Sequence, residues 1–222
     1  MNLLCFGDSL MQLNGLDTFP QEGWPQELEP YLQEGVSVLD FAKNGRSTKS
    51  FIDEGLFEEG LERAKGGDVA LISFGHNDEK KEDPTRYTTA YGTYQENLVY
   101  MIDELKKKGV KSVLLTSIAR FRYNPDGSLR FTHGEYPEAM RELAKKISLP
   151  LVDLNKLTRD YLSSHPEKEN QRFYMNFGPH LYPNYPEGKD DHTHMRKEGA
   201  QWICSLVVPE LKKIDSLKEF FR

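Results

Sequence analysis

Short apolar runs alternate with longer amphipathic segments along most of the chain. The run Val69–Phe74 is apolar nearly throughout, as expected of a strand that is covered on both faces. Four other runs have a similar length and are also predicted to be strands. The five predicted strands are Leu3–Phe6, Val36–Phe41, Val69–Phe74, Val110–Ser117 and Leu151–Leu154.

The segments between these strands are predicted to be helices. Tyr87–Lys108 is the longest of them, with an apolar stripe at helical spacing and Gly109 as its stop signal. The other predicted helices are Pro25–Leu32, Thr48–Ala64, Tyr136–Ile147, Leu157–Leu162, Lys197–Val207 and Glu210–Phe221. Such alternation favours right-handed βαβ units, with a parallel sheet between two layers of helices. No repeat or long linker divides the chain, so one α/β domain over residues 1–222 is expected.

One segment has neither the helical nor the strand period. Residues 171–190 are rich in Pro, Tyr, Phe and Gly, and are predicted to form a long irregular loop. Loops of this length in compact domains are uncommon and usually functional.

Charge and composition exclude some classes of function. The formal net charge of −6 argues against a nucleic-acid-binding surface, which is normally basic. No apolar stretch approaches the roughly 20 residues that a membrane-spanning helix needs. The N-terminus lacks a basic region before its apolar run, so a signal peptide is not expected and a cytoplasmic location is. Cys5 and Cys204 both lie among apolar residues and are predicted to be buried thiols. The oligomeric state is left open.

The first predicted strand is followed directly by Gly7-Asp8-Ser9-Leu10. In open α/β sheets ligands bind at the carboxyl ends of the strands, so Ser9 is placed where chemistry occurs. Serine is a poor nucleophile alone and needs a base, a group that orients the base, and donors for the oxyanion. A near-copy, Asp126-Gly127-Ser128-Leu129, lies in a predicted turn. Position therefore favours Ser9 over Ser128 as the nucleophile. The structural alternative is that Ser9 only caps the turn.

Candidates for the other groups also lie beside strand ends. Asn77 follows the third strand and Gly45 the second, where an amide and a backbone N–H can face Ser9. Near the C-terminus, Asp190-Asp191-His192-Thr193-His194 offers an acid three residues before a histidine, at a predicted helix entrance. Caps and turns remain alternatives for Gly45, Asn77 and Asp78. The histidines, with Asp190, Asp191 and His76, could also bind a metal, although no HxxxH helix or Cys ligand accompanies them.

These blocks, in this order, resemble the signature blocks of the SGNH (GDSL) hydrolase superfamily. Asn44-Gly45-Arg46-Ser47, Gly75-His76-Asn77-Asp78, Thr132-His133-Gly134-Glu135-Tyr136 and Asp191-His192-Thr193-His194 are similar to the rhamnogalacturonan acetylesterase branch. The resemblance implies a flavodoxin-like three-layer α/β/α sandwich with five parallel strands. It also implies Ser9 as nucleophile, His194 as base, Asp191 as its orienter, and an oxyanion hole of Ser9, Gly45 and Asn77. No metal or organic cofactor is implied.

An acetylated pectic oligosaccharide would be the substrate of such an enzyme, and its galacturonate would call for cations near Ser9. The candidate cations are Arg46, Lys49, Arg120, Arg122 and Arg196. Aromatic residues of the long loop could stack on sugars: Tyr174, Phe177, Tyr182 and Tyr185. Arg46, His76, Arg122 and Tyr182 are the predicted substrate contacts. Alternatively, the charged residues are only solvated surface residues, and the aromatic residues only pack together as a lid, without contacting a substrate.

Three alternatives remain at this point. One is a different SGNH esterase that acts on acetyl-xylan or on short acyl esters or thioesters. A second is a flavodoxin-like module that binds flavin mononucleotide, for which Leu10-Met11-Gln12-Leu13 makes a poor phosphate loop. The third is a catalytically inactive carbohydrate-binding protein. No GxSxG, GxxxxGK or GxGxxG motif supports another hydrolase or nucleotide-binding class.

Overall fold

Five parallel strands form the central sheet in the computed structural model, which describes residues 1–222. They are β1 (Asn2–Gly7), β2 (Ser37–Asp40), β3 (Val69–Ser73), β4 (Lys111–Leu115) and β5 (Leu151–Val152). Their order is β2-β1-β3-β4-β5, so the chain turns to one side of β1 for β2 and to the other side for β3. This is the flavodoxin-like order, and it puts a topological switch point between β1 and β3. The predicted fold class is confirmed.

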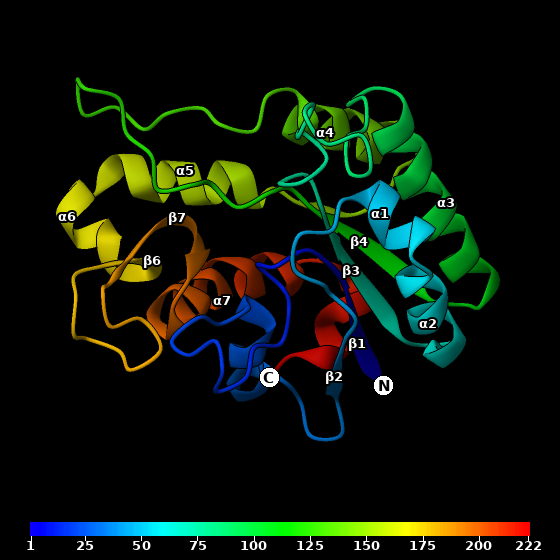
Figure 1. The fold of residues 1–222 in the computed structure, drawn as a ribbon. Helices are drawn as coiled ribbons and strands as arrows, with labels where there is room; N and C mark the ends of the chain where they lie inside the picture. Colours follow the sequence, from blue (N-terminus) through cyan, green and yellow to red (C-terminus); the bar gives the residue numbers. More distant parts are fainter.

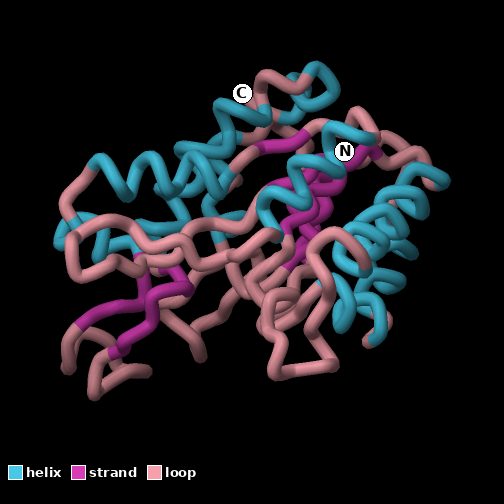
Figure 2. The backbone as a smooth tube through the Cα atoms, turned by 90° about the horizontal axis from the view of Figure 1, so that it is seen from above, coloured by secondary structure: helices cyan, strands magenta, loops and turns pink.

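Helices cover both faces of this sheet (Figures 1 and 2). Strand β1 shows why, because its side chains alternate between two apolar clusters. Leu4 and Phe6 join a cluster with α1 to α4, whereas Leu3 and Cys5 join one with α5 and α7. The helices are α1 (Thr48–Asp53), α2 (Leu56–Arg63), α3 (Thr93–Lys107), α4 (Tyr136–Lys146), α5 (Leu154–Ser164), α6 (Glu167–Asn170) and α7 (Lys197–Leu211). No helix is long and apolar enough to cross a membrane.

Several predicted helices have different bounds. The segment Thr48–Ala64 divides into α1 and α2 at Gly55, whose φ of 75° lies in the left-handed region. Helix α3 begins only at Thr93, and the segment 25–32 forms two short 3₁₀ helices, Trp24–Glu27 and Glu29–Tyr31. A helix over Glu210–Phe221 is wrong: α7 ends at Leu211, Ile214 is extended, and Asp215–Phe220 is a 3₁₀ helix.

The predicted irregular loop over 171–190 is also partly wrong. It holds a 3₁₀ turn (Gln171–Phe173), strand β6 (Tyr174–Phe177) and the start of β7 (Lys189–Met195), which pairs antiparallel with β6. This hairpin stands apart from the main sheet, beside α7 (Figure 1). Both strands are short and β7 is mostly polar, so the sequence shows no alternation of apolar and polar residues that would predict them. Cys5 and Cys204 are buried and free, as predicted.

Candidate active site

Three strand ends of the main sheet supply one side of the candidate site. Ser9 follows β1 and Asn77 follows β3, and these strands are neighbours with Gly7 opposite Ser73. Gly45 lies in the loop after β2, on the other side of β1. The three residues therefore meet at the carboxyl edge of the sheet, next to the switch point at which such sheets bind ligands.

His194 and Asp191 reach this edge from strand β7. The Nε2 atom of His194 lies 2.8 Å from Ser9 Oγ, and its Nδ1 atom lies 2.7 Å from Asp191 Oδ2. A carboxylate only accepts, so Nδ1 carries the proton and Nε2 is left to accept from the Ser9 hydroxyl. Residues separated by 185 positions are thus aligned as a serine, a base and an acid that orients the base.

An irregularity in the pairing of β6 with β7 places Asp191 and His194 beside Ser9. Between the paired positions Tyr174–Met195 and Asn176–Asp190, β7 contains three more residues than β6, and the excess is pushed out toward Ser9. Asp191 Oδ1 holds this turn by accepting the N–H groups of Thr193 (2.8 Å) and His194 (3.0 Å). The residues therefore lie on a bulged strand, whereas the sequence placed them at a helix entrance.

The surroundings of Asp191 keep it ionised. Burial alone would raise the pKa of this carboxyl. The hydrogen bond and charge of His194, together with the two backbone N–H groups, outweigh burial and hold the pKa of Asp191 well below its usual range. Asp191 can therefore balance an imidazolium that forms at His194.

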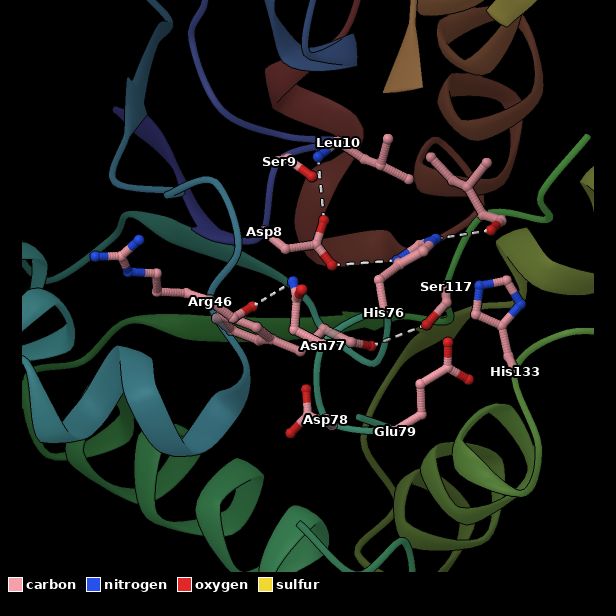
Figure 3. Close-up of polar contacts among 12 residues, drawn as sticks. Asp8, Ser9, Leu10, Arg46, His76, Asn77, Asp78, Glu79, Ser117 and His133 are labelled. Atoms are coloured by element: carbon pink, nitrogen blue, oxygen red, sulfur yellow. Dashed lines mark hydrogen bonds and ion pairs between the residues drawn. The ribbon is translucent and has the colours of Figure 1, made fainter. Parts of the chain in front are cut away.

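Donors converge on the other side of Ser9. The backbone N–H groups of Ser9 and Gly45 donate to no group within the chain. Gly45 has a φ of 76°, in the left-handed region where a residue with a Cβ is strained. The amide nitrogen of Asn77 donates one hydrogen to Arg46 O (3.0 Å), which leaves its second hydrogen for another acceptor (Figure 3). The structure thus brings together all five residues predicted for the triad and oxyanion hole.

Arg86 orients the Asn77 amide, and sequence reasoning missed it. Its Nη1 atom lies 3.5 Å from both Asn77 Oδ1 and Gly45 O, while its Nε atom bonds Asp83. A cation on the amide oxygen fixes which end of Asn77 points to Arg46 O. Arg86 lies in an irregular loop with no motif, so only the long-range contact could identify it.

Asp78 anchors the loop that carries Asn77. Its carboxylate accepts from the N–H and hydroxyl of Thr48, at the start of α1, and from the hydroxyl of Thr88. Burial raises the pKa of Asp78 to about 7 despite these donors. Asp78 therefore does not cap the helix that follows it, α3, which begins at Thr93 after Gly92. It instead fixes the start of α1 to the end of β3.

The predicted substrate contacts are placed unevenly. Arg46 is one-third exposed beside the oxyanion donors but is paired with Glu54 at 2.7 Å. Arg122 is exposed. Tyr182 packs edge-on against Phe19 and Phe177, so it joins two loops at the rim.

His76 is not available to a substrate, because it is buried and both ring nitrogens are occupied. Its ring nitrogens contact Asp8 and the Ile118 carbonyl.

The other candidate cations are mostly engaged. Arg120 pairs with Glu79 at 2.6 Å, Lys49 Nζ donates to Pro84 O at 2.7 Å, and Arg196 donates to Tyr182 Oη at 3.2 Å. In the long loop, Tyr174 is fully buried.

The remaining histidine and serine candidates lie elsewhere. His192 donates through Nδ1 to Phe121 O and pairs with Asp190 through Nε2, so neither of its ring nitrogens contacts Ser9. No three metal-binding side chains gather at one point. Ser128 sits in an exposed turn and donates to Asp126.

Comparison with known proteins assigns the chain to a family. The model of the GDSL-like Lipase/Acylhydrolase family matches residues 5–202, so the chain belongs to that family. It is 37% identical over 195 residues to rhamnogalacturonan acetylesterase RhgT of Bacillus subtilis, with 88% of this chain and 82% of the relative covered. It is 32% identical over 208 residues to probable rhamnogalacturonan acetylesterase YesY of the same organism, with 94% and 91% covered. The protein is a carboxylic ester hydrolase.

Solved structures share the fold. The Bacillus subtilis protein YXIM superposes with a TM-score of 0.80 at 25% identity, covering 96% of this chain and 56% of that one. This chain thus spans little more than half of that structure's chain. The acetylxylan esterase Axe2 of Geobacillus stearothermophilus, solved as a catalytic mutant, gives a TM-score of 0.63 at 15% identity, with 94% and 93% covered.

Proposed function

We propose that the protein removes acetyl groups from acetylated rhamnogalacturonan-type oligosaccharides through an acetyl-enzyme on Ser9. The observation that carries the mechanism is the aligned contact of Ser9 Oγ, His194 and Asp191, at 2.8 and 2.7 Å, beside three unused hydrogen-bond donors. The names of the two Bacillus subtilis relatives support the substrate class.

The chemistry follows from this arrangement. His194 Nε2 takes the hydroxyl proton as Ser9 Oγ attacks the acetyl carbonyl, and Asp191 stabilises the imidazolium. The oxyanion is held by the Ser9 and Gly45 N–H groups and the Asn77 amide, donors that are already positioned before the reaction. The oxyanion then collapses and the bond between the acetyl carbon and the sugar oxygen breaks, while His194 gives its proton to that oxygen. Water then takes the place of the sugar hydroxyl and repeats the sequence to release acetate.

Acetate release from three substrates tests the proposal. Acetylated rhamnogalacturonan oligosaccharides are compared with acetylated xylo-oligosaccharides and p-nitrophenyl acetate. We expect the pectic fragments to give the highest kcat/KM. Equal or better turnover of the xylan fragments would overturn the substrate assignment, and activity on p-nitrophenyl acetate alone would do the same.

Two serine variants test the mechanism in the same assay. Ser9→Ala should abolish turnover of every substrate. Ser128→Ala is the matched control, because Ser128 belongs to the near-copy of the motif in an exposed turn, and it should retain full activity. Substantial acetate release by a folded Ser9→Ala variant would rule out the acetyl-enzyme.

A further inference from the structure

A buried contact between Asp8 and His76 joins the two strand ends that carry Ser9 and Asn77, and it takes no part in the triad. Asp8 follows β1 and His76 follows β3, so each immediately precedes a residue of the hole (Figure 3). His76 Nδ1 lies 3.1 Å from Asp8 Oδ2, and the two side chains are only 7% and 3% exposed. The pair thus links the two strand ends that flank the switch point.

Hydrogen bonding fixes the protons of this pair. His76 Nε2 faces the carbonyl oxygen of Ile118 at 3.1 Å, and a carbonyl can only accept, so Nε2 carries a hydrogen. Burial would raise the pKa of Asp8, but the charge and hydrogen bond of His76 lower it. Asp8 is therefore a carboxylate, and both ring nitrogens of His76 face oxygen atoms that accept hydrogen bonds.

A second histidine, His133, packs against His76. The His133 ring stands edge-on to His76, with centroids 4.6 Å apart. Burial, followed by the charges of His76 and Arg120, lowers the pKa of His133 well below its usual value, so this ring is neutral. The His133 ring therefore packs against His76 and makes no hydrogen bond to either of its nitrogens.

The pair also shapes the turn that carries Ser9. Asp8 Oδ1 accepts the N–H of Leu10 at 3.0 Å, and Asp8 O accepts the N–H of Met11 at 3.1 Å. The N–H of Ser9 alone is left without a partner in this turn, where it can meet an oxyanion. Replacing a buried ion pair by apolar residues is often neutral or stabilising, so stability alone is a weak reason for its presence.

We propose that the Asp8–His76 pair is a positioning device for the oxyanion hole: it fixes the Ser9 N–H from β1 and the Asn77 amide from β3 relative to each other. This inference rests on the proposed function of the same site. Asp8 and His76 touch neither substrate nor reacting atoms, so they are positioning residues. Misplacement of a catalytic group by about 1 Å can cost about 10²-fold in rate.

Two substitutions of His76 distinguish a role in positioning, through the hydrogen bond to Asp8, from a role in filling space. Asn can replace the Nδ1 donor that meets Asp8, whereas Gln can replace the Nε2 donor that meets Ile118. We expect His76→Gln to lower kcat on p-nitrophenyl acetate about 10²-fold with KM changed less than threefold, and His76→Asn to recover about tenfold of that loss. If Gln retains as much kcat as Asn, the inference is overturned.

Asp8 gives an independent test should the His76 variants fold poorly. Asp8→Asn keeps an acceptor for Leu10 N–H and can donate to a neutral His76, whereas Asp8→Ala removes both contacts. The Asn variant should therefore lose markedly less kcat than the Ala variant, with thermal unfolding measured for each. Equal losses in the two folded variants would contradict positioning through these bonds.

A double-mutant cycle connects the pair to the hole. If His76 acts through Asn77, adding His76→Gln to Asn77→Ala should cost far less than it does in the wild-type background. Additive losses would show that His76 acts elsewhere. Ser9→Ala separates the two proposals. If this variant still turns over substrate, the proposed function is wrong. If it is inactive but the losses in the double-mutant cycle are additive, only the present inference is wrong.

Discussion

At the scale of single residues, Asn77 carries two tasks with one amide. It donates one hydrogen to Arg46 O and keeps the other for the proposed oxyanion, while Arg86 holds its oxygen. Removing the side chain takes away a donor that matters most when charge develops on the carbonyl oxygen. Asn77→Ala is therefore expected to lower kcat about 10² to 10³-fold.

Steady-state kinetics on p-nitrophenyl acetate check this expectation, with circular dichroism to confirm the fold. A loss below tenfold would remove Asn77 from the oxyanion hole. Arg86→Met is a graded comparison, since it releases the Asn77 amide oxygen without removing the donor. It should cost less than Asn77→Ala.

Arg46 is the residue whose charge can be tuned in both directions. It lies next to Gly45 and is paired with Glu54. If the substrate carries galacturonate, Arg46→Glu should raise KM for acidic oligosaccharides about three- to tenfold, since one exposed charge contact is worth roughly 1 kcal/mol. Glu54→Gln, which frees the guanidinium, should shift KM the opposite way. Both effects should be absent with p-nitrophenyl acetate, and unchanged KM values for acidic substrates would exclude Arg46 from binding.

The residues of the candidate site differ in how far the sequence could identify them. Ser9, Gly45, Asn77, Asp191 and His194 stand in recognisable blocks beside predicted strand ends. The His76–Asp8 contact joins residues 68 positions apart and has no local pattern.

At the scale of elements, contiguous apolar runs made the parallel strands predictable, because both faces of the central strands β1 and β3 are covered. The hairpin was not predictable in this way. Strand β7 reads Lys189-Asp190-Asp191-His192-Thr193-His194-Met195, which is polar except at its end. Its folding depends on contacts with β6 and on the Phe121 N–H bond to His192 O, which are set by the tertiary structure.

The approach of α2 to β1 depends on one glycine. A Cβ at Gly60 would lie 2.4 Å from Phe6 Cε1 and 2.9 Å from Phe6 Cζ, closer than real contacts allow. Gly60→Ala should therefore destabilise the protein by about 1 to 3 kcal/mol through overpacking, even though alanine favours helices.

Urea unfolding measures the effect of this substitution. Gly178→Ala is the matched control, because no atom lies within 4 Å of its Cβ position and the change should be nearly neutral. A Gly60→Ala variant as stable as the wild type would show that α2 can move away from β1 at no cost.

At the scale of the whole molecule, buried carboxyls link stability to pH. Burial is the main cause that raises the pKa values of Glu22, Asp40 and Asp78, each to about 7. Such a group favours the protonated form in the folded state, so its contribution to stability falls as pH rises from about 4 to about 7. His133, whose pKa is lowered by burial, has the opposite effect: below about pH 6.5 its contribution to stability rises as pH rises.

Comparison of a variant with the wild type isolates one of these groups. Asp78→Asn keeps an acceptor for Thr48 and Thr88 but cannot ionise. The difference in Tm between variant and wild type should shift in favour of the variant as pH rises from 4.5 to 7.5, as measured by thermal melts in matched buffers. A difference that is constant over this range would mean that Asp78 has the same pKa in the folded and unfolded chain.

The distance along the chain between Ser9 and His194 has a consequence for synthesis. A ribosome delivers the N-terminal part first, so β1 and the serine emerge long before the hairpin that carries His194 and Asp191. The first strands of the sheet are therefore made while Ser9 has no histidine beside it. Under the proposed mechanism, the Ser9 hydroxyl of a nascent chain stays inert, and hydrolysis starts only after β7 has been made and His194 has reached Ser9.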